Sequence, residues 1–299
     1  GFILRDSSEG ARRAVGDSAR HAGRRFLARG VLLAALAGWP AKGLAWGPSA
    51  HRLMTNKAVD ALPPELQPYF EASRSFIVQH VTDPTAALQR NPAERRNHYI
   101  YLDRYGRFPF PGIPHDYKAA LAKIGSLKLN QNGLLPWQVG VYSLKLTEAM
   151  RANRWDEARE RAAELAFYVG EAHDPFSTTE NWSGGLSHQP GVNLRFDTSL
   201  VDRYSLFFVI RPNPAMFIPD STEHAFGMVT EAHTWLDNIL LADQRSRSDL
   251  PDYTDEYYDR FYNQAGAVLA RQLTDAATDI GSYWFTAWLN AGQPNPPVQ

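Results

Sequence analysis

Trp46 and His51 are the two residues whose types and spacing most directly suggest metal chemistry. The residues before Trp46 have the three parts of an export signal, namely adjacent arginines, a short apolar run and small residues ending at Ala45. Cleavage after Ala45 would make Trp46 the first residue, and a free amine and its neighbouring carbonyl can chelate a metal ion together. His51 follows five residues later, so its imidazole can reach the same ion.

Residues 1–45 are therefore predicted to be an export signal that is removed. Arg24-Arg25 followed by Phe26-Leu27 favours the twin-arginine route, with an ordinary secretory signal as the alternative. The apolar run of residues 31–37 is too short to span a bilayer, and no other segment of the sequence suggests a membrane span. We expect an exported protein, located in the periplasm or outside the cell.

Composition excludes several classes of site and partner. The chain has no cysteine, so thiolate metal sites, catalytic cysteines and disulfides are excluded. Of 31 Lys and Arg and 32 Asp and Glu, eight and three lie in residues 1–45, which leaves 23 and 29 in residues 46–299. The resulting net charge of about −6 argues against binding nucleic acid by charge alone. No feature indicates an obligate protein partner, and about 250 residues are consistent with one domain spanning 46–299.

Apolar spacing predicts a mainly α-helical fold. Small and apolar residues recur at helical spacing along 155–173, where Phe167 and Glu171 share a face. Segment 177–197 is rich in Gly, Ser, Asn and Pro and is predicted to be a long loop. The many aromatic residues of segment 255–290 are predicted to be core rather than membrane anchors. Further helices are predicted over 49–62, 139–150 and 222–242.

Several short blocks, in this order, resemble the superfamily of zinc-dependent phospholipases C and single-strand-specific nucleases. The blocks are Trp46-Gly47 with His51, Asp83, the segment 96–103, Leu135-Pro136-Trp137, the segment 167–176, Asn181 and the segment 191–197. The resemblance covers about 46–290. It implies an all-α domain with long loops around a metal cleft, in which three zinc ions hydrolyse phosphodiesters.

The resemblance also implies which residues bind metal. The ligand positions that this sequence retains are Trp46, His51, Asp83, His98, Glu171 and Asp197. Three expected histidines are replaced, by Phe167, Ser177 and Asn193. Glu171 stands where the family has an aspartate that bridges two ions. Phenylalanine cannot coordinate a metal, so an intact three-metal centre is not expected.

The remaining ligands divide into three unequal sites. Trp46, His51 and Glu171 form a complete set, and Asp83, His98 and Glu171 keep three ligands, so one or two zinc ions are expected. The site around Asp197 offers only oxygen atoms, which suit calcium or magnesium better. His173, Asp174 and His188 are alternative ligands. The structural alternatives are that His98 is a core histidine, that Asp83 only starts a turn, and that His173 and Asp174 cap a helix.

Two functions are compatible with this depleted site. The first is an exported metal-dependent phosphoesterase that acts on a phosphodiester small molecule or a phospholipid head group. In it, Asp83 would position or deprotonate the attacking water, whose pKa a bound ion lowers. The second is a catalytically silent member of the same superfamily that binds a metal or ligand without hydrolysis.

Overall fold

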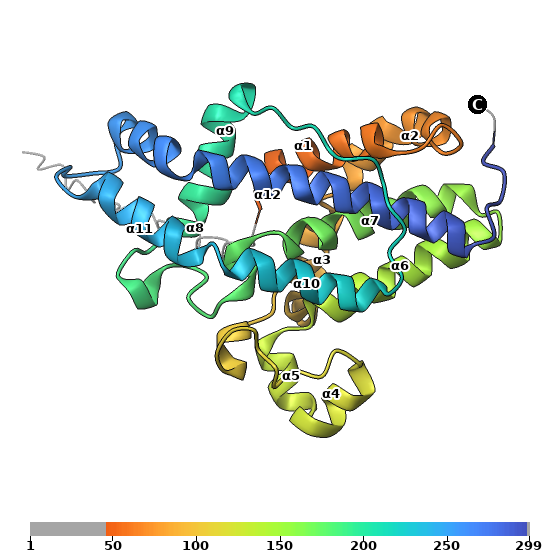
Figure 1. Ribbon diagram of the computed structural model, residues 1–299, viewed down its shortest axis with the longest axis horizontal. Coiled ribbons are helices and arrows are strands. Elements are labelled where there is room, and N and C mark those ends of the chain that lie inside the picture. Colours follow the sequence, from red (N-terminus) through yellow and green to blue (C-terminus); the bar gives the residue numbers. More distant parts are fainter. Residues whose placement is uncertain (1–45, 298–299) are drawn as a thin grey trace, which may run out of the picture. The chain divides into compact units, whose positions relative to one another are not determined.

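Every regular element of the part of the chain that the computed structural model describes, residues 46–297, is a helix (Figure 1). This confirms the predicted all-α fold class. The predicted export signal, residues 1–45, lies outside the described residues and stays a prediction, as does a single domain over 46–299. None of the described helices is long and apolar enough to cross a lipid bilayer.

Helix α7, Trp155–Ala172, is the central buried helix, and its sequence explains both its ends. Asp156 and Glu157 lie in the first turn, where carboxylates interact favourably with the helix dipole. The chain leaves the helix at His173, just before Asp174-Pro175, because the residue before a proline disfavours helical geometry. The predicted helix over 155–173 is confirmed to within one residue.

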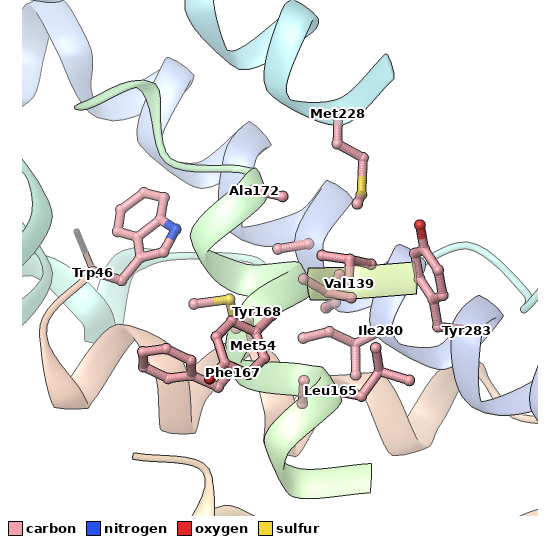
Figure 2. Close-up of a cluster of buried hydrophobic side chains, with 14 of the residues drawn as sticks. Trp46, Met54, Val139, Leu165, Phe167, Tyr168, Ala172, Met228, Ile280 and Tyr283 are labelled. Atoms are coloured by element: carbon pink, nitrogen blue, oxygen red, sulfur yellow. The ribbon is translucent and has the colours of Figure 1, made fainter. Parts of the chain in front are cut away.

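Helix α7 packs mainly against α1 (Pro48–Ala58), α2 (Gln67–His80), α6 (Leu135–Arg151) and α12 (Asp255–Asn290). Figure 2 shows the apolar core between them, with Phe167 and Tyr168 projecting from α7 and Trp46 beside it. The aromatic residues Tyr257, Phe261, Tyr283 and Trp284 of α12 are fully buried. The prediction that this helix contributes to the core is therefore confirmed.

The predicted helix over 222–242 is in fact two helices, α10 (Ser221–His233) and α11 (Leu236–Arg247). The Asp220 carboxylate caps α10 by accepting hydrogen bonds from the backbone N–H groups of Thr222 and Glu223, each at 2.9 Å. The predicted loop over 177–197 contains a 3-10 helix at Gly185–Ser187 and ends in helix α8 (Val192–Leu194) and a π-helix at Arg195–Leu200. The other short helices are α3 (Asp83–Arg90) and α9 (Val201–Tyr204).

Helices α4 (Tyr117–Ile124) and α5 (Ser126–Asn132) form an arm that projects from the other helices, in yellow-green in Figure 1. Sequence analysis did not predict these two helices. Each spans only two turns and ends at a glycine with positive φ, Gly125 or Gly133. Gly133 is required for a second reason, since a Cβ there would lie 2.0 Å from the Tyr99 carbonyl oxygen.

An irregular segment, residues 208–219, runs along the outside of α12, and we call it the strap. Its backbone N–H groups at Asn213, Met216 and Ile218 donate to three hydroxyls of α12, at 3.0, 3.1 and 2.9 Å. The accepting residues, Thr278, Ser282 and Thr286, are four apart and so lie along one helix face. Three backbone donors that lack a helix or sheet partner are satisfied in this way.

Candidate metal-binding cluster

A buried group of polar side chains lies where the start of the described chain meets α7. We call it the buried cluster; it consists of Trp46, His51, His98, Glu171, Asp174 and Asp197, none of which is more than 3% exposed. Helix α1 positions His51, and α7 positions Glu171. Asp197 lies in the π-helix, a type of helix that is frequent at functional sites.

The close crossing of α1 over α7 depends on Gly170. A Cβ at Gly170 would lie 3.0 Å from the Met54 side chain and 3.1 Å from His51 Nδ1, so a larger residue would require both side chains to shift. The Gly170 carbonyl also accepts a hydrogen bond from the Trp46 indole at 2.9 Å. This contact fixes the position of Trp46 against α7.

Glu171 makes the central polar contacts of the buried cluster. Its Oε1 is 2.9 Å from His51 Nε2, and its Oε2 is 4.0 Å from His98 Nδ1. The buried cluster therefore contains five of the six predicted metal ligands, namely Trp46, His51, His98, Glu171 and Asp197. Both ring nitrogens of His98, Nδ1 of His51 and Oε2 of Glu171 have no hydrogen-bond partner.

Phe167 occupies the space between the two imidazoles. Its ring stacks on His51 with centroids 4.5 Å apart and planes 19° apart, and it meets His98 edge-on at 5.0 Å. Burial lowers the pKa of both histidines to about 3, with a smaller contribution for His98 from the neighbouring His51 and Arg95. Both imidazoles are therefore neutral at physiological pH, the form that can bind a metal.

Three carboxyl groups, those of Glu171, Asp174 and Asp197, are completely buried in this region. Burial raises the pKa of all three well above the ordinary range, and repulsion from neighbouring carboxyls raises it further for Asp174 and Asp197. Within residues 46–297, none of them forms a salt bridge with lysine or arginine. These groups must therefore be protonated, or a cation must lie among them.

Asp83, the predicted catalytic residue and metal ligand, does not join the buried cluster. It begins α3, its side chain is 62% exposed, and its Oδ2 is 2.8 Å from His80 Nδ1. Its role as the start of a helix fits the structural alternative better than the catalytic one. His188 is also exposed, and its left-handed backbone (φ 59°) lies in a loop. Neither residue replaces a missing ligand in the cluster.

The three positions where the resemblance expects histidine are all buried. Phe167 packs as described, Ser177 Oγ donates to the His98 carbonyl at 3.3 Å, and Asn193 is 3% exposed. Neither oxygen of Asp197 has a hydrogen-bond partner. The Asp197 carboxyl is therefore available to a small cation, but its predicted binding of calcium or magnesium is untested.

The residues of the buried cluster do not fit a centre of three zinc ions. Among residues 46–297, no three side chains of His, Asp or Glu are arranged so that they could hold a metal ion together. What remains is His51 and Glu171, together with the backbone of Trp46. His51 Nδ1 and Glu171 Oε2 have no hydrogen-bond partner, and we derive no hydrolytic step from an ion at these residues.

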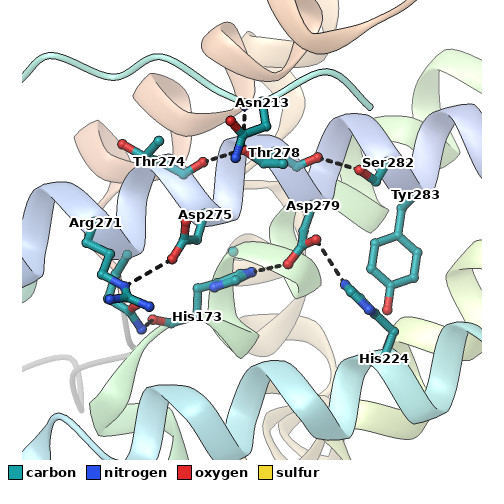
Figure 3. A network of polar contacts seen from close by, with 12 residues as sticks. His173, Asn213, His224, Arg271, Thr274, Asp275, Thr278, Asp279, Ser282 and Tyr283 are labelled. Atoms are coloured by element: carbon teal, nitrogen blue, oxygen red, sulfur yellow. Dashed lines mark hydrogen bonds and ion pairs between the residues drawn. The ribbon is translucent and has the colours of Figure 1, made fainter. Parts of the chain in front are cut away.

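A second polar group begins at His173, two residues after Glu171. Its three residues line a surface cavity, and we call it the surface network. His173 Nε2 and His224 Nε2 contact the two carboxylate oxygens of Asp279, at 2.8 and 2.9 Å (Figure 3). Sequence analysis weighed His173 only as a metal ligand or a cap, and it missed His224 and Asp279. No sequence signal connects them, because the three residues come from the end of α7, from α10 and from α12.

Comparison with known proteins adds a likeness in fold. No protein-family model and no curated protein sequence matches the chain. Among solved structures, the chain is similar to the alpha toxin from Clostridium absonum, with 10% sequence identity and a TM-score of 0.47. The match covers 81% of this chain and 63% of the toxin chain, so the chain matches less than two thirds of the toxin's length. At this identity the likeness concerns the helical fold alone.

Proposed function

We propose that this protein is an exported, catalytically silent protein with a phospholipase-C-like fold, in which one metal ion attaches the mature amino terminus to the helices. The ion is held by the amine and carbonyl of Trp46, by His51 and by Glu171. The observation that carries the proposal is the position of Phe167, which stacks on His51 and fills the space beside His98. That ring lies where the resemblance expects a metal-binding histidine, and it cannot supply a ligand.

Burial supports a structural ion over a catalytic one. Catalytic zinc keeps an open coordination position for water or substrate, whereas structural zinc is enclosed by protein ligands. His51 and Glu171 are 1% and 0% exposed. Four surface cavities of about 380 to 750 Å³ in the described part of the chain are lined by other residues. No residue of the buried cluster lines any of these four cavities.

The first experiment counts metal and tests for hydrolysis. The full-length chain is exported and purified without chelators, its first residue is identified by mass spectrometry, and bound metals are measured by plasma mass spectrometry. We expect Trp46 as the first residue, about one zinc per chain, and no hydrolysis of bis-nitrophenyl phosphate. Zinc-dependent hydrolysis would instead favour the phosphoesterase, and metal-free protein would contradict the proposed ion.

A gain of a ligand tests the role of Phe167 directly. Phe167→His places a third imidazole between His51 and His98, so zinc affinity should rise by at least the roughly ten-fold that outer-shell partners of metal sites contribute. The matched control is Phe207→His, because Phe207 is 70% exposed and lies outside the cluster. Equal zinc affinity in the two variants would show that Phe167 does not border a metal site.

A further inference from the structure

A cavity of about 610 Å³ lies between the arm and the helices α6 and α10, on residues outside the buried cluster. Its lining combines apolar side chains from α4 and α6 with carboxylates from α10 and from the residue before α4. Pockets that bind small molecules have this combination of an apolar lining and a few convergent polar groups.

The apolar wall of the cavity is built around Trp137. Its indole N–H donates to the His115 carbonyl at 2.8 Å, which fixes the ring, and only 6% of the residue is exposed. Tyr117 meets it edge-on, with ring centroids 5.8 Å apart and planes 67° apart. Val141 and Leu144 of α6 continue the wall and are 45% and 56% exposed. A ligand with an apolar body would bury both.

The charges around the cavity have one predominant sign. Three carboxylates line it, those of Asp116, Asp220 and Glu223, whereas none of the described residues lining it is lysine or arginine. Asp116 and Asp220 each cap a helix through Oδ1, which leaves the other oxygen of each available. The one basic group is His115, whose Nδ1 lies 2.6 Å from Glu223 Oε2. A ligand at this cavity would meet a negative rim and an aromatic wall.

From this arrangement, we infer that the cavity between the arm and α6 is a binding site for an organic cation with an apolar body. The aromatic ring of Tyr117, which lines the cavity and is 42% exposed, and the nearby carboxylates both favour positive charge. Val141 and Leu144 accommodate the hydrocarbon part of the ligand. This inference is independent of the proposed metal ion, because it depends on none of the residues of the buried cluster.

A matched set of three probes tests the charge preference. The probes are 4-phenylbutylamine, 4-phenylbutanol and 4-phenylbutyrate, which share one apolar body and carry positive, zero and negative charge near pH 7. Isothermal titration calorimetry of the full mature chain should give the tightest binding for the amine. We expect the amine to bind about five-fold more tightly than the alcohol, because exposed charge contacts are weak. The carboxylate should bind more weakly than the alcohol.

Paired variants locate the site. Leu144→Ser should weaken binding of the amine by about three- to ten-fold through lost apolar contact, whereas Leu241→Ser should not, since Leu241 is similarly exposed on α11. Glu223→Gln should weaken it by about two- to five-fold, and Glu148→Gln, on the exposed face of α6, should not.

Three results would overturn the inference. Equal affinities for the three probes would remove the preference for a cation. Absence of binding up to the solubility limit of the amine would remove the site. Equal weakening by Glu223→Gln and Glu148→Gln would mean that the net charge of the protein, and not this cavity, attracts the amine. Thermal unfolding of each variant checks that it remains folded.

Discussion

The buried cluster and the surface network contain the same kinds of side chain, two imidazoles and carboxyl groups, yet their electrostatics are opposite. In the cluster, burial lowers the pKa of His51 to about 3 and raises that of Glu171. In the network, burial alone would raise the pKa of Asp279, but hydrogen bonds from His173 and His224 outweigh it and lower the pKa. The His224 pKa is raised, chiefly by its hydrogen bond to Asp279.

The difference lies in hydrogen bonding and not in residue type. Both oxygens of Asp279 are occupied by imidazole nitrogens, whereas both oxygens of Asp197 lack a partner. A buried charge is tolerated when it is paired and hydrogen-bonded, and otherwise the group becomes neutral. The surface network is complete within the protein, and the buried cluster is complete only with protons or with a cation from outside.

The largest expected change in the free energy of unfolding is for a variant of the buried cluster. His51→Ala leaves the buried Glu171 carboxyl without its hydrogen bond and opens a cavity beside the Phe167 ring, so the free energy of unfolding should fall by about 3–5 kcal/mol. Denaturant unfolding measures this change. His188→Ala, at an exposed loop position, should change it by less than about 0.5 kcal/mol. Similar small values for both variants would mean that His51 and Glu171 do not depend on each other.

The next largest effect is in the surface network. Asp279→Asn removes the negative charge that holds two imidazoles, which should cost about 2 kcal/mol, as for hydrogen bonds to charged groups. Because its pKa is lowered, Asp279 stabilises the fold at pH values above the usual aspartate pKa, and this stabilisation is lost as the pH falls. Because its pKa is raised, His224 stabilises the fold below about pH 6.5, and this stabilisation is lost as the pH rises.

The cost of Asp279→Asn should therefore be largest between about pH 4 and 6.5. Denaturant unfolding of the two proteins at pH 5.5 and pH 9 checks this window. A cost that does not vary with pH would mean that the contacts of Asp279 are steric and not electrostatic.

Asp197→Asn is expected to raise the free energy of unfolding, by less than the two preceding variants lower it. Because the pKa of Asp197 is raised, its contribution is present below the usual aspartate pKa and is lost as the pH rises through the folded-state value. Without metal, the variant should therefore be more stable than the parent at pH 8, by about 1 kcal/mol, and little changed at pH 4.5. Denaturant unfolding with chelator present measures both. Destabilisation at pH 8 would indicate that Asp197 is ionised and paired.

The smallest effect is expected for His224→Asn. The His224 side chain is 39% exposed, so solvent screens its ion pair with Asp279, and the loss at pH 6 should be about 0.5 kcal/mol or less. The chemical shifts of the His173 ring should nevertheless change, because both rings share one carboxylate. Nuclear magnetic resonance of the histidine rings measures this. Unchanged His173 shifts would show that the two contacts are independent.

Sequence analysis predicted the helices in which apolar residues recur at helical spacing. The spacing of apolar residues located α7, and it predicted the buried face of α12. The contact of His51 with Glu171 was expected from the resemblance, and the structure brings these side chains together at 2.9 Å. Whether they bind metal stays a prediction.

The remaining features depend on contacts between distant residues. The structure places Asp83 outside the buried cluster: its position at the start of α3 and its contact with His80 are local, whereas its predicted role required a contact across the fold. The Asp279 network was missed because Asp279 is 106 residues from His173 and 55 from His224. The helices α4 and α5 are too short for apolar periodicity to reveal them.

The hydroxyl groups beneath the strap have a consequence for local opening. Thr278 and Ser282 also donate to carbonyls one turn earlier in α12, at 3.0 and 2.9 Å, so these hydroxyls stay bonded if the strap lifts away. Only the strap would then have unpaired donors, and water can reach them. Amide hydrogen exchange at Asn213 and Met216 should consequently report detachment of the strap, while the amides of the helix beneath stay protected.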